Sequence, residues 1–422
     1  MPTPPPHPRR LAWASRNFRI QTAATVISGL GSAGAPVATA FAVLGSGGST
    51  TEVGYVTAAR LLPTVLLLVL GGGLADRLPR HRIMVAANLF NAASQAVLAA
   101  LVLSGDARLW HLLALSAAGG AGHALYAPAS SGMIMQAVPQ EHAARAFSVF
   151  RMGQNASQIG GAALGGALTA AFGPGWVLAL DALCFLVAAA LRFFLEPEQA
   201  PAPSGGGMLR DLSEGWREFA SRRWLWVIVL QFSVLVACVE AVESVYGPTV
   251  AAERLGGASA WGLAMSAFGL GLVATGLLMA RWRPRRILLV GNWGVFLFGM
   301  PALALAAAVP LPLLTAAMFL SGVGVTVFGV NWMVALRQEI PAEMFSRVSA
   351  YDLLGSNALA PAGTALAGPA AVALGLGGAL WTCAVVCQLL SAAVLLDPQV
   401  RRLSRRSTAD APVPAAEPVP TS

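Results

Sequence analysis

The chain has 422 residues, of which 56% are hydrophobic and only 11% are charged. An ordinary soluble domain carries about 25% charged residues, so this composition excludes a soluble globular protein. The mean hydropathy of +0.67 over the whole length indicates many separate apolar segments rather than one anchor. We therefore predict an all-α membrane protein whose solvent is the lipid bilayer.

Apolar runs of about 20 residues, broken by charges or by Gly and Pro clusters, predict twelve transmembrane helices. These are 17–43, 53–75, 83–104, 109–137, 146–171, 175–195, 224–250, 259–281, 287–309, 312–337, 348–373 and 376–396. The connections 172–174, 310–311 and 374–375 are very short and leave no room for an external domain. We expect the protein to act within or across the bilayer.

The basic residues predict the orientation of these helices. All 27 are arginine, and every one except Arg60, Arg108 and Arg254 falls on the side that also holds both termini. This bias predicts cytoplasmic termini in the cell inner (plasma) membrane. A nucleic-acid partner would need a basic stripe on one folded surface, which scattered short loops do not supply, so none is expected.

The predicted helices group into two bundles joined by a linker. We expect a cytoplasmic N-terminal tail (1–16), a six-helix bundle (17–195), a linker (196–223), a second six-helix bundle (224–396) and a disordered cytoplasmic tail (397–422). No signal peptide is evident at the start. In the linker, Trp216 and Phe219 share one face with Leu209 and Leu212, which predicts an amphipathic helix on the cytoplasmic membrane surface.

The four cysteines lie inside apolar stretches and are interpreted as small buried packing residues. Cys383 and Cys387 share a helix face, but no His or carboxylate lies near them in sequence to complete a metal site. No metal and no cofactor are therefore expected.

An internal repeat relates the two predicted bundles. QAVPQEHAARAFSVFRMGQNASQIGGAALGG in the first half aligns without a gap with QEIPAEMFSRVSAYDLLGSNALAPAGTALAG in the second. The alignment pairs Pro139 with Pro341, Glu141 with Glu343, Arg145 with Arg347, Gly153 with Gly355, Asn155 with Asn357 and Gly166 with Gly368. A second stretch, GGLADRLPRHRI, matches GLLMARWRPRRI with Asp76 replaced by Ala280. Two parallel halves with a site between them are typical of one class of secondary transporters.

The sequence resembles the major facilitator superfamily over residues 10–396. GGLADRLPRHR is similar to that family's G-x-x-x-D-R-x-G-R-R/K signature, supplied here by Gly72, Asp76, Arg77, Arg80 and Arg82. Pro79 stands where the family has its second glycine, and His81 replaces a basic position. The resemblance implies a gate in which Asp76 caps the N-terminal end of the predicted helix 348–373 and holds the cytoplasmic side closed. The alternative is that these charges only fix the topology.

Two further segments resemble the enterobactin-exporter and macrolide-efflux subgroup, and this implies an exporter. They are Asn17-Phe18-Arg19 at the start of helix 1 and the region between helices 4 and 5. Two features depart from drug/proton antiporters. Helix 4 has no membrane-embedded Arg, and the Gly-Pro of the antiporter helix 5 motif is Gly160-Gly161 here.

Charged residues inside the membrane are functional candidates because each costs at least about 2.5 to 3.5 kcal/mol. Glu240 and Glu243 are predicted on one inward face of the helix 224–250, where one of them is expected to hold a proton near neutral pH. They are the leading proton-coupling candidates. The alternative is a structural role in which they pair with Arg60 of helix 2.

The remaining candidates are assigned by their depth in the predicted helices. Arg60 is expected to attract an anionic substrate group or to pair with the glutamates. Asp181 is a lower-ranked proton-coupling candidate near the outer end of the predicted helix 175–195, where hydration is expected to suffice. His123 is a candidate proton relay or substrate ligand, with a buried structural histidine as the alternative. Tyr126 follows it on helix 4 and is a candidate cavity residue.

Four further residues are placed at the contact between the halves. Asn155 and Asn357 are predicted to line or brace that contact, and Arg151 and Asp352 to act as cytoplasmic gate charges. Pro36, Gly247-Pro248 and the spacing of Gly161 and Gly165 predict bending or close packing of helices.

The sequence as a whole predicts a monomeric secondary transporter that exports an amphipathic small molecule against proton entry. An importer, or a membrane sensor or scaffold that does not transport, is the alternative. We expect no enzymatic activity, because no P-loop, G-x-S-x-G elbow or metal-binding cluster is present in the sequence.

Overall fold

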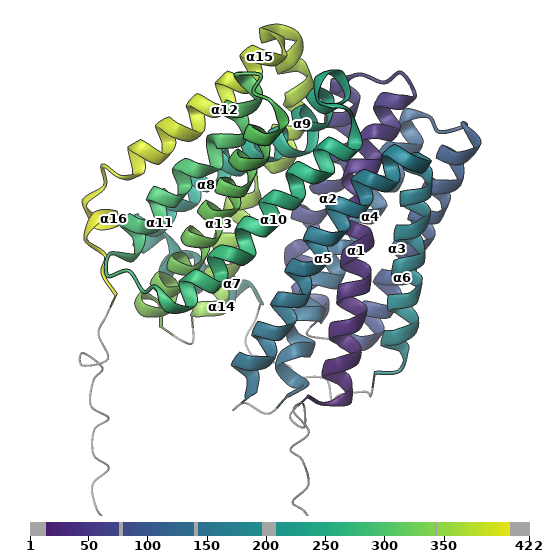
Figure 1. Cartoon of the computed structure of the whole chain (residues 1–422). Coiled ribbons are helices and arrows are strands. Elements are labelled where there is room, and N and C mark those ends of the chain that lie inside the picture. The colour runs from purple at the N-terminus through teal and green to yellow at the C-terminus, as the bar shows by residue number, and fades with distance from the viewer. Residues whose placement is uncertain (1–13, 76–78, 139–141, 196–207, 342–343, 406–422) are drawn as a thin grey trace, which may run out of the picture.

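The computed structural model describes residues 14–75, 79–138, 142–195, 208–341 and 344–405, and these parts are helical apart from short connections. The first six helices are α1 (Arg16–Gly45), α2 (Thr50–Ala75), α3 (Arg80–Ser104), α4 (Leu109–Gln136), α5 (Ala143–Phe172) and α6 (Pro174–Phe193). Figure 1 shows them side by side as one group, which we call the N-terminal helix group.

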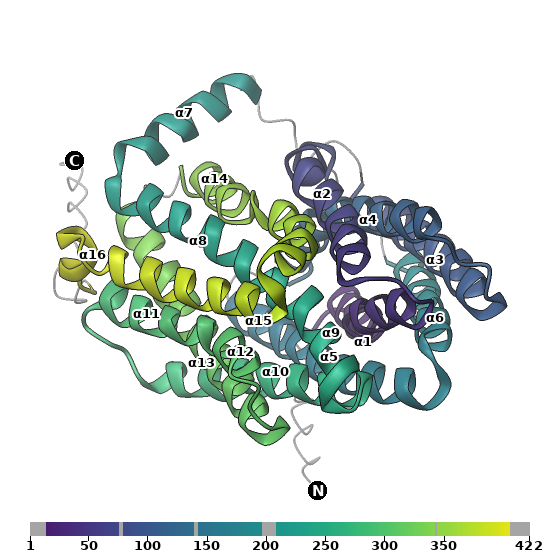
Figure 2. The same cartoon turned by 90° about the horizontal axis from the view of Figure 1, so that it is seen from above.

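Most of the remaining helices form the C-terminal helix group. It contains α8 (Arg223–Ala241), α9 (Gly247–Val250), α10 (Ala258–Arg281), α11 (Ile287–Val295), α12 (Met300–Ala306), α13 (Leu311–Glu339), α14 (Phe345–Asn357) and α15 (Ala360–Val394). Two short helices stand outside both groups, α7 (Met208–Ser221) and α16 (Pro398–Arg402). Figure 2 places both at the rim of the C-terminal helix group.

Eight described stretches are long and apolar enough to cross a membrane by length and composition, whereas the sequence predicts twelve spans. The other four predicted spans correspond to α2, α4, α5 and one half of α15. The stretch Arg347–Val394 is divided at Gly375, whose φ of 73° is not helical, so it holds two of the predicted spans. Glycine tolerates this left-handed conformation because it has no Cβ.

Several predicted helices continue through irregular turns. The span predicted at 224–250 extends to Leu255 through two π-helical segments, Val242–Tyr246 and Ala251–Leu255. They lie on either side of Pro248, so the chain passes this proline by widening its turns. The span predicted at 287–309 likewise changes to a 3₁₀ turn at Phe296–Gly299 before Pro301.

The predicted C-terminal tail and the predicted linker each contain a helix in the structure. The tail predicted to be disordered from residue 397 begins with α16, because Asp397 accepts a hydrogen bond from the backbone N–H of Gln399 and Val400 is buried. The linker residues 196–207 lie outside the described part of the chain. Its helix α7 packs against α14 through an Arg347–Glu214 ion pair of 2.7 Å and contacts of Trp216 and Phe219 with Tyr351.

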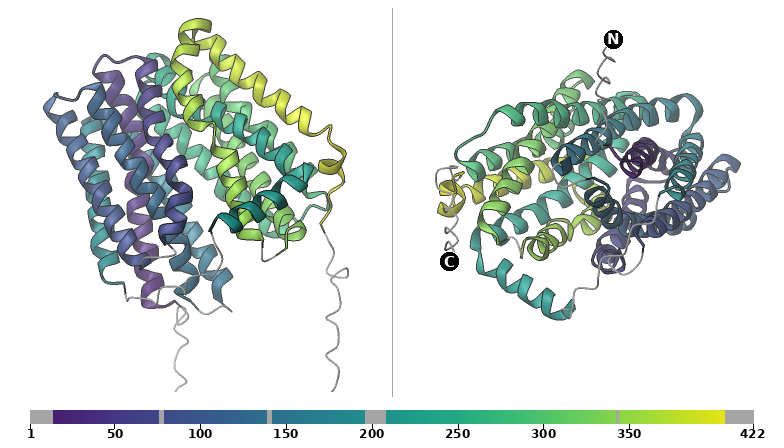
Figure 3. Two further views of the ribbon diagram at one scale, coloured as in Figure 1. Left: turned by 180° about the vertical axis from the view of Figure 1, so that it is seen from behind. Right: turned by 90° about the horizontal axis from the view of Figure 1, so that it is seen from below.

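The two helix groups meet at one end and diverge at the other. Figure 1 and the left panel of Figure 3 show them closest at the end that carries the connection between α1 and α2, and apart where α1 begins. The largest contacts between the groups are those of α5 with α10 and of α2 with α15. Each of these two contacts pairs one helix of the N-terminal helix group with one helix of the C-terminal helix group.

Glycines allow both crossings to be close. A Cβ added at Gly262 of α10 would lie 2.8 Å from the carbonyl oxygen of Ala162 and from Cα of Gly166, both on α5. At the second crossing, a Cβ at Gly368 of α15 would lie 2.1 Å from Cα of Thr51 on α2. Gly166 and Gly368 are equivalent in the internal repeat, so the two crossings use the same device.

We expect Gly262→Ala to destabilise the packed end, because the added methyl group would meet α5 backbone atoms that cannot move independently. The expected cost is about 1–3 kcal/mol, as for other overpacked sites, seen as a lower melting temperature of the purified protein. Gly276→Ala on the same helix is the matched control, since no atom lies within 4 Å of the added Cβ. Equal melting temperatures of the two variants would contradict the close crossing.

Candidate functional site

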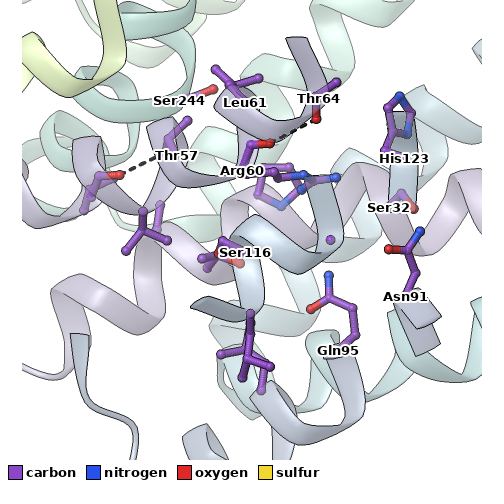
Figure 4. A pocket seen from close by; sticks show the side chains of 18 of the residues that line it. Ser32, Thr57, Arg60, Leu61, Thr64, Asn91, Gln95, Ser116, His123 and Ser244 are labelled. Carbon is purple, nitrogen blue, oxygen red and sulfur yellow. Dashed lines mark hydrogen bonds between the residues drawn. The ribbon is translucent and has the colours of Figure 1, made fainter. Parts of the chain in front are cut away.

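A cavity of about 270 Å³ lies inside the N-terminal helix group and reaches the start of the C-terminal group. Residues of α1, α2, α3, α4 and α6 form most of its wall, and Glu240 of α8 with Ser244 of the following π-helical segment complete it. Figure 4 shows polar side chains of α1, α2, α3 and α4 around one space. The labelled polar lining comprises Ser32, Thr57, Arg60, Thr64, Asn91, Gln95, Ser116, His123 and Ser244.

Arg60 is held in this wall by a close contact of α2 with α4. A Cβ at Gly120 would lie 1.9 Å from the Arg60 carbonyl oxygen, so only glycine permits this approach. The Thr64 hydroxyl lies 3.0 Å from the Arg60 carbonyl oxygen and 3.1 Å from that of Gly120. The backbone of Arg60 is therefore fixed while its side chain lines the cavity.

The Arg60 guanidinium is the positive centre of the site. It interacts electrostatically with Asp181, Glu240 and His123. Among the residues that the structure describes, it has no ion pair within 4.0 Å and donates no side-chain hydrogen bond. The predicted direct pairing of Arg60 with a glutamate is therefore absent from this structure, and the guanidinium remains available to a ligand.

Asp181 is fully buried, with 0% exposure, and stands behind the cavity wall. Gln95 donates to its Oδ2 at 2.8 Å and Ser32 to its Oδ1 at 3.4 Å. The expectation that hydration suffices for this carboxyl group is corrected, because protein groups surround it. Gly31 of α1 leaves the space, since a Cβ there would lie 2.6 Å from Oδ1.

The two glutamates predicted to share a face line different spaces. Glu240 lines the main cavity and accepts a hydrogen bond from Ser244 at 3.2 Å. Glu243 lines a much smaller cavity with Cys238, Phe298 and Cys387. Its Oε1 is buried and has no hydrogen-bond partner within the described chain. The helix becomes π-helical from Val242 on, so the two glutamates stand on either side of the junction between an α-helical and a π-helical segment.

His123 lines the cavity on α4, but Tyr126 does not. Tyr126 instead belongs to a polar network around Arg192, a residue that sequence reasoning counted only among the cytoplasmic charges. Arg192 has 0% exposure near the end of α6. Its Nη2 donates to the Tyr126 hydroxyl at 2.7 Å and to Thr25 at 2.9 Å, and its Nε donates to Gln21 at 3.0 Å.

No carboxylate takes part in this network within the described residues. The guanidinium also lies over the Tyr126 ring, 4.8 Å from its centroid, and Ser130 accepts from Gln21 at 2.8 Å. Neutral dipoles and an aromatic face thus solvate a buried cation and tie α1, α4 and α6 together. The sequence contained one signal of this burial, because Arg192 lies inside the apolar run 175–195. The rule that basic residues lie on the cytoplasmic side also accounts for an arginine at this position, so its burial was not predicted.

The other predicted site residues are not brought together. Asn155 and Asn357 do not line the cavity, and Asn357 donates to the Leu353 carbonyl of its own helix at 2.8 Å. Arg151 is exposed and bonds Gln154, whereas Asp352 accepts from Trp332 Nε1 at 2.9 Å. Arg80 and Arg82 lie in the first turn of α3 and Gly72 in the last turns of α2. Asp76 and Arg77 lie outside the described residues.

The cysteines are free thiols, with Cys383 and Cys387 buried and Cys184 and Cys238 half-buried. The Cys238 thiol of α8 contacts those of Cys383 and Cys387 on α15. In the described ranges no group of three or more His, Cys, Asp or Glu side chains is arranged to hold a metal ion.

Comparison with known proteins identifies the relatives of this chain. Residues 12–418 match the family model described as transmembrane secretion effector, MFS_3. The chain is 28% identical over 307 residues to the MFS-type transporter YfiS of Bacillus subtilis, covering 68% of this chain and 70% of that protein. It is 27% identical over 409 residues to the multidrug efflux pump Tap of Mycolicibacterium fortuitum, covering 91% and 96%.

Solved structures share the fold at low sequence identity. The nucleoside transporter NupG matches with a TM-score of 0.71 and 11% identity, covering 90% of this chain and 98% of that one. An inward-facing, occupied bacterial homolog of the human lysosomal transporter Spinster matches with a TM-score of 0.68 and 17% identity, covering 90% and 95%. The chain belongs to the transmembrane secretion effector family of major facilitator superfamily transporters. It is a multi-pass membrane transporter and not an enzyme.

We expect Tyr126→Phe to destabilise the protein, because it leaves the fully buried Arg192 Nη2 short of one acceptor. An unsatisfied buried polar group costs about 1–3 kcal/mol, and more when it is charged. Differential scanning fluorimetry of the purified protein measures the effect. Tyr55→Phe is the matched control, since Tyr55 is 42% exposed, and a control as destabilised as Tyr126→Phe would refute the network's role.

Proposed function

We propose that the protein exports an amphipathic small molecule in exchange for protons, by alternating access of one central site to the two sides of the membrane. The observation that supports this most is the cavity around Arg60, where a cation stands within electrostatic range of Asp181, Glu240 and His123. Charges in a membrane protein are costly and are retained where they serve transport.

The composition of the cavity wall supports an amphipathic substrate. Hydroxyl and amide groups such as those of Thr57, Asn91 and Gln95 alternate with apolar residues such as Val56 and Leu98. An apolar wall with a few polar groups is typical of small-molecule sites. The cavity holds about 270 Å³ in this conformation, at the small end of such sites, and a change of conformation would enlarge it.

Protons are the proposed coupling ion, with Glu240 as the coupling carboxylate that faces substrate. A proton on Glu240 would cancel its attraction to Arg60, and its loss would restore that attraction, so protonation and substrate binding would compete for the same charge balance. Asp181 and His123 surround Arg60 from other helices and remain candidates for the same role. Glu243, in its separate small cavity, becomes a candidate for a structural role instead.

Alternating access is proposed to use the two helix groups as moving bodies, with 17–195 and 224–396 as their bounds. The groups pack at one end and diverge at the other (Figure 1), as one of two alternating states requires. We propose that the diverging end is cytoplasmic and carries both termini. Closing it would bring together the proposed gate residues, which are Gly72, Asp76, Arg77, Arg80, Arg82, Arg151 and Asp352.

The export direction is supported by the efflux function named for Tap and by the family description as a secretion effector. The likeness of Asn17-Phe18-Arg19 to siderophore and macrolide exporters points the same way and remains a proposal, as does a monomeric state. An importer is the second candidate, because the nucleoside transporter NupG shares the fold.

Reconstitution into liposomes with an imposed pH gradient tests this function, using a fluorescent amphipathic dye such as ethidium within a wider substrate panel. Wild-type protein is expected to accumulate substrate against its gradient as protons flow the other way. We expect Glu240→Gln to lose pH-driven accumulation by more than tenfold while it still exchanges substrate down its gradient. Arg60→Gln is expected to lose binding as well.

Glu253→Gln and Arg254→Gln are the matched controls, because both side chains are exposed and neither lines the cavity. Both are expected to transport as wild type does. Accumulation along the proton flow would indicate an importer, and ligand binding without flux would indicate a sensor. Unchanged coupling in Glu240→Gln would remove this residue from the mechanism.

A further inference from the structure

A third and more open cavity, of about 590 Å³, lies at a corner of the C-terminal helix group, away from the N-terminal helix group. The start of α8, the end of α13 and the helix α16 form it, and it is lined by Arg222, Arg223, Trp224, Glu339 and Arg402 among others. Three of its lining side chains are therefore guanidinium groups, and we call this place the basic corner.

Two of these guanidinium groups retain capacity for another anion. Arg222 is occupied by Glu218 of α7. Arg223 lies 3.4 Å from Asp397, but its side chain remains 69% exposed. Arg402 is exposed and, within the described part of the chain, its side chain has no ion pair and no hydrogen bond. An anion placed between Arg223 and Arg402 would meet two accessible guanidinium groups.

Neighbouring segments add positive charge to the same corner. The backbone N–H of Arg405 donates to the Arg285 carbonyl at 2.7 Å, and Gln338 donates to the Ser404 carbonyl at 3.2 Å. These bonds bring the connection before α11 and the end of α13 to the cavity. Exposed arginines of these segments are Arg285, Arg286, Arg337 and Arg401. The local acidic residues, Glu218, Glu339 and Asp397, are fewer than the arginines.

The corner also borders apolar surface that would face lipid. Figure 2 shows α16 at the outer edge of the C-terminal helix group, beside α11 and α15 and away from the N-terminal group. Leu389 of α15 and Leu396 beyond its end are 64% and 71% exposed, and Trp226 of α8 is 41% exposed. A ligand at this corner would thus meet cations at one end and exposed apolar side chains at the other. Exposed tryptophan is typical of the level of lipid head groups.

We propose that the basic corner binds the anionic head group of a phospholipid, with its acyl chains along the exposed face of α15 and α8. Arg223 and Arg402 hold the phosphate, and the surrounding arginines raise the local concentration of anionic lipid. A soluble anion would use the guanidinium groups alone and gain nothing from the apolar border. The proposal does not depend on what the protein transports or in which direction.

Binding is measured on the full-length protein in detergent by native mass spectrometry and by the shift of melting temperature. The probes are dioctanoyl phosphatidylglycerol, zwitterionic dioctanoyl phosphatidylcholine and inorganic phosphate. We expect saturable binding and stabilisation with phosphatidylglycerol only. Arg223→Gln/Arg402→Gln is expected to weaken it about 25-fold, since each cation near a lipid surface contributes about 1 kcal/mol, or about fivefold.

Two further variants separate charge from fold. Arg223→Lys/Arg402→Lys keeps both charges and is expected to retain most of the affinity. Arg19→Gln/Arg217→Gln removes two exposed arginines outside the cavity and is expected to bind as wild type does. Equal binding of phosphatidylcholine, equal stabilisation by phosphate, or unchanged affinity in Arg223→Gln/Arg402→Gln would each overturn the proposal.

Discussion

The structure depends on one constraint, namely that a charge buried between membrane helices must be solvated by the protein itself. The N-terminal helix group meets it twice. Around Arg192 the solvating groups are hydroxyls, an amide and the Tyr126 ring, which bind Nε, Nη2 and the face of the cation and join three helices. Around Arg60 the carboxyl groups of Asp181 and Glu240 act at longer range and leave the guanidinium open to the cavity. The first arrangement suits a structural role and the second suits a binding site, although both use the same residue type.

The sequence predicts the fold well because hydropathy and the internal repeat are properties of long segments. A span of 20 apolar residues has one available structure in lipid, and the repeat of Asn155 with Asn357 implies two related halves. Local irregularity is less predictable. The π-helical segment at Val242–Tyr246 has no hydropathy signal, and the fold of α16 depends on the burial of Val400 against neighbours remote in sequence.

The sequence shows which residues are candidates for the site, but it does not show which of them lie together. Arg60, His123 and Glu240 are recognisable as charged or titratable residues in apolar runs, and all three line the cavity. Tyr126 and Glu243 lie outside this cavity because of the rotation of their helices about the helix axes. A single sequence does not specify that rotation precisely enough to say which side chains face the cavity. Arg192 was overlooked for a different reason. Arginine near a helix end satisfies the rule for orientation, so only the surrounding Gln21 and Thr25 reveal that it is buried.

The two halves contact each other through equivalent glycine crossings, but their interiors differ in chemistry. The repeat-related Gly166 and Gly368 give each half one close crossing at the packed end. The interiors differ, since the N-terminal group holds ionisable groups around a cavity while the C-terminal group holds stacked rings, with Phe232 and Phe328 centroids 4.2 Å apart. A close-packed aromatic core resists deformation, so motion is expected at the contacts between the groups. Glu240 and Ser244 reach the cavity from the C-terminal group, so a movement of that group would also change the field around Arg60. The proposed coupling between the conformation of the protein and the charge state of the site would then run through this one helix.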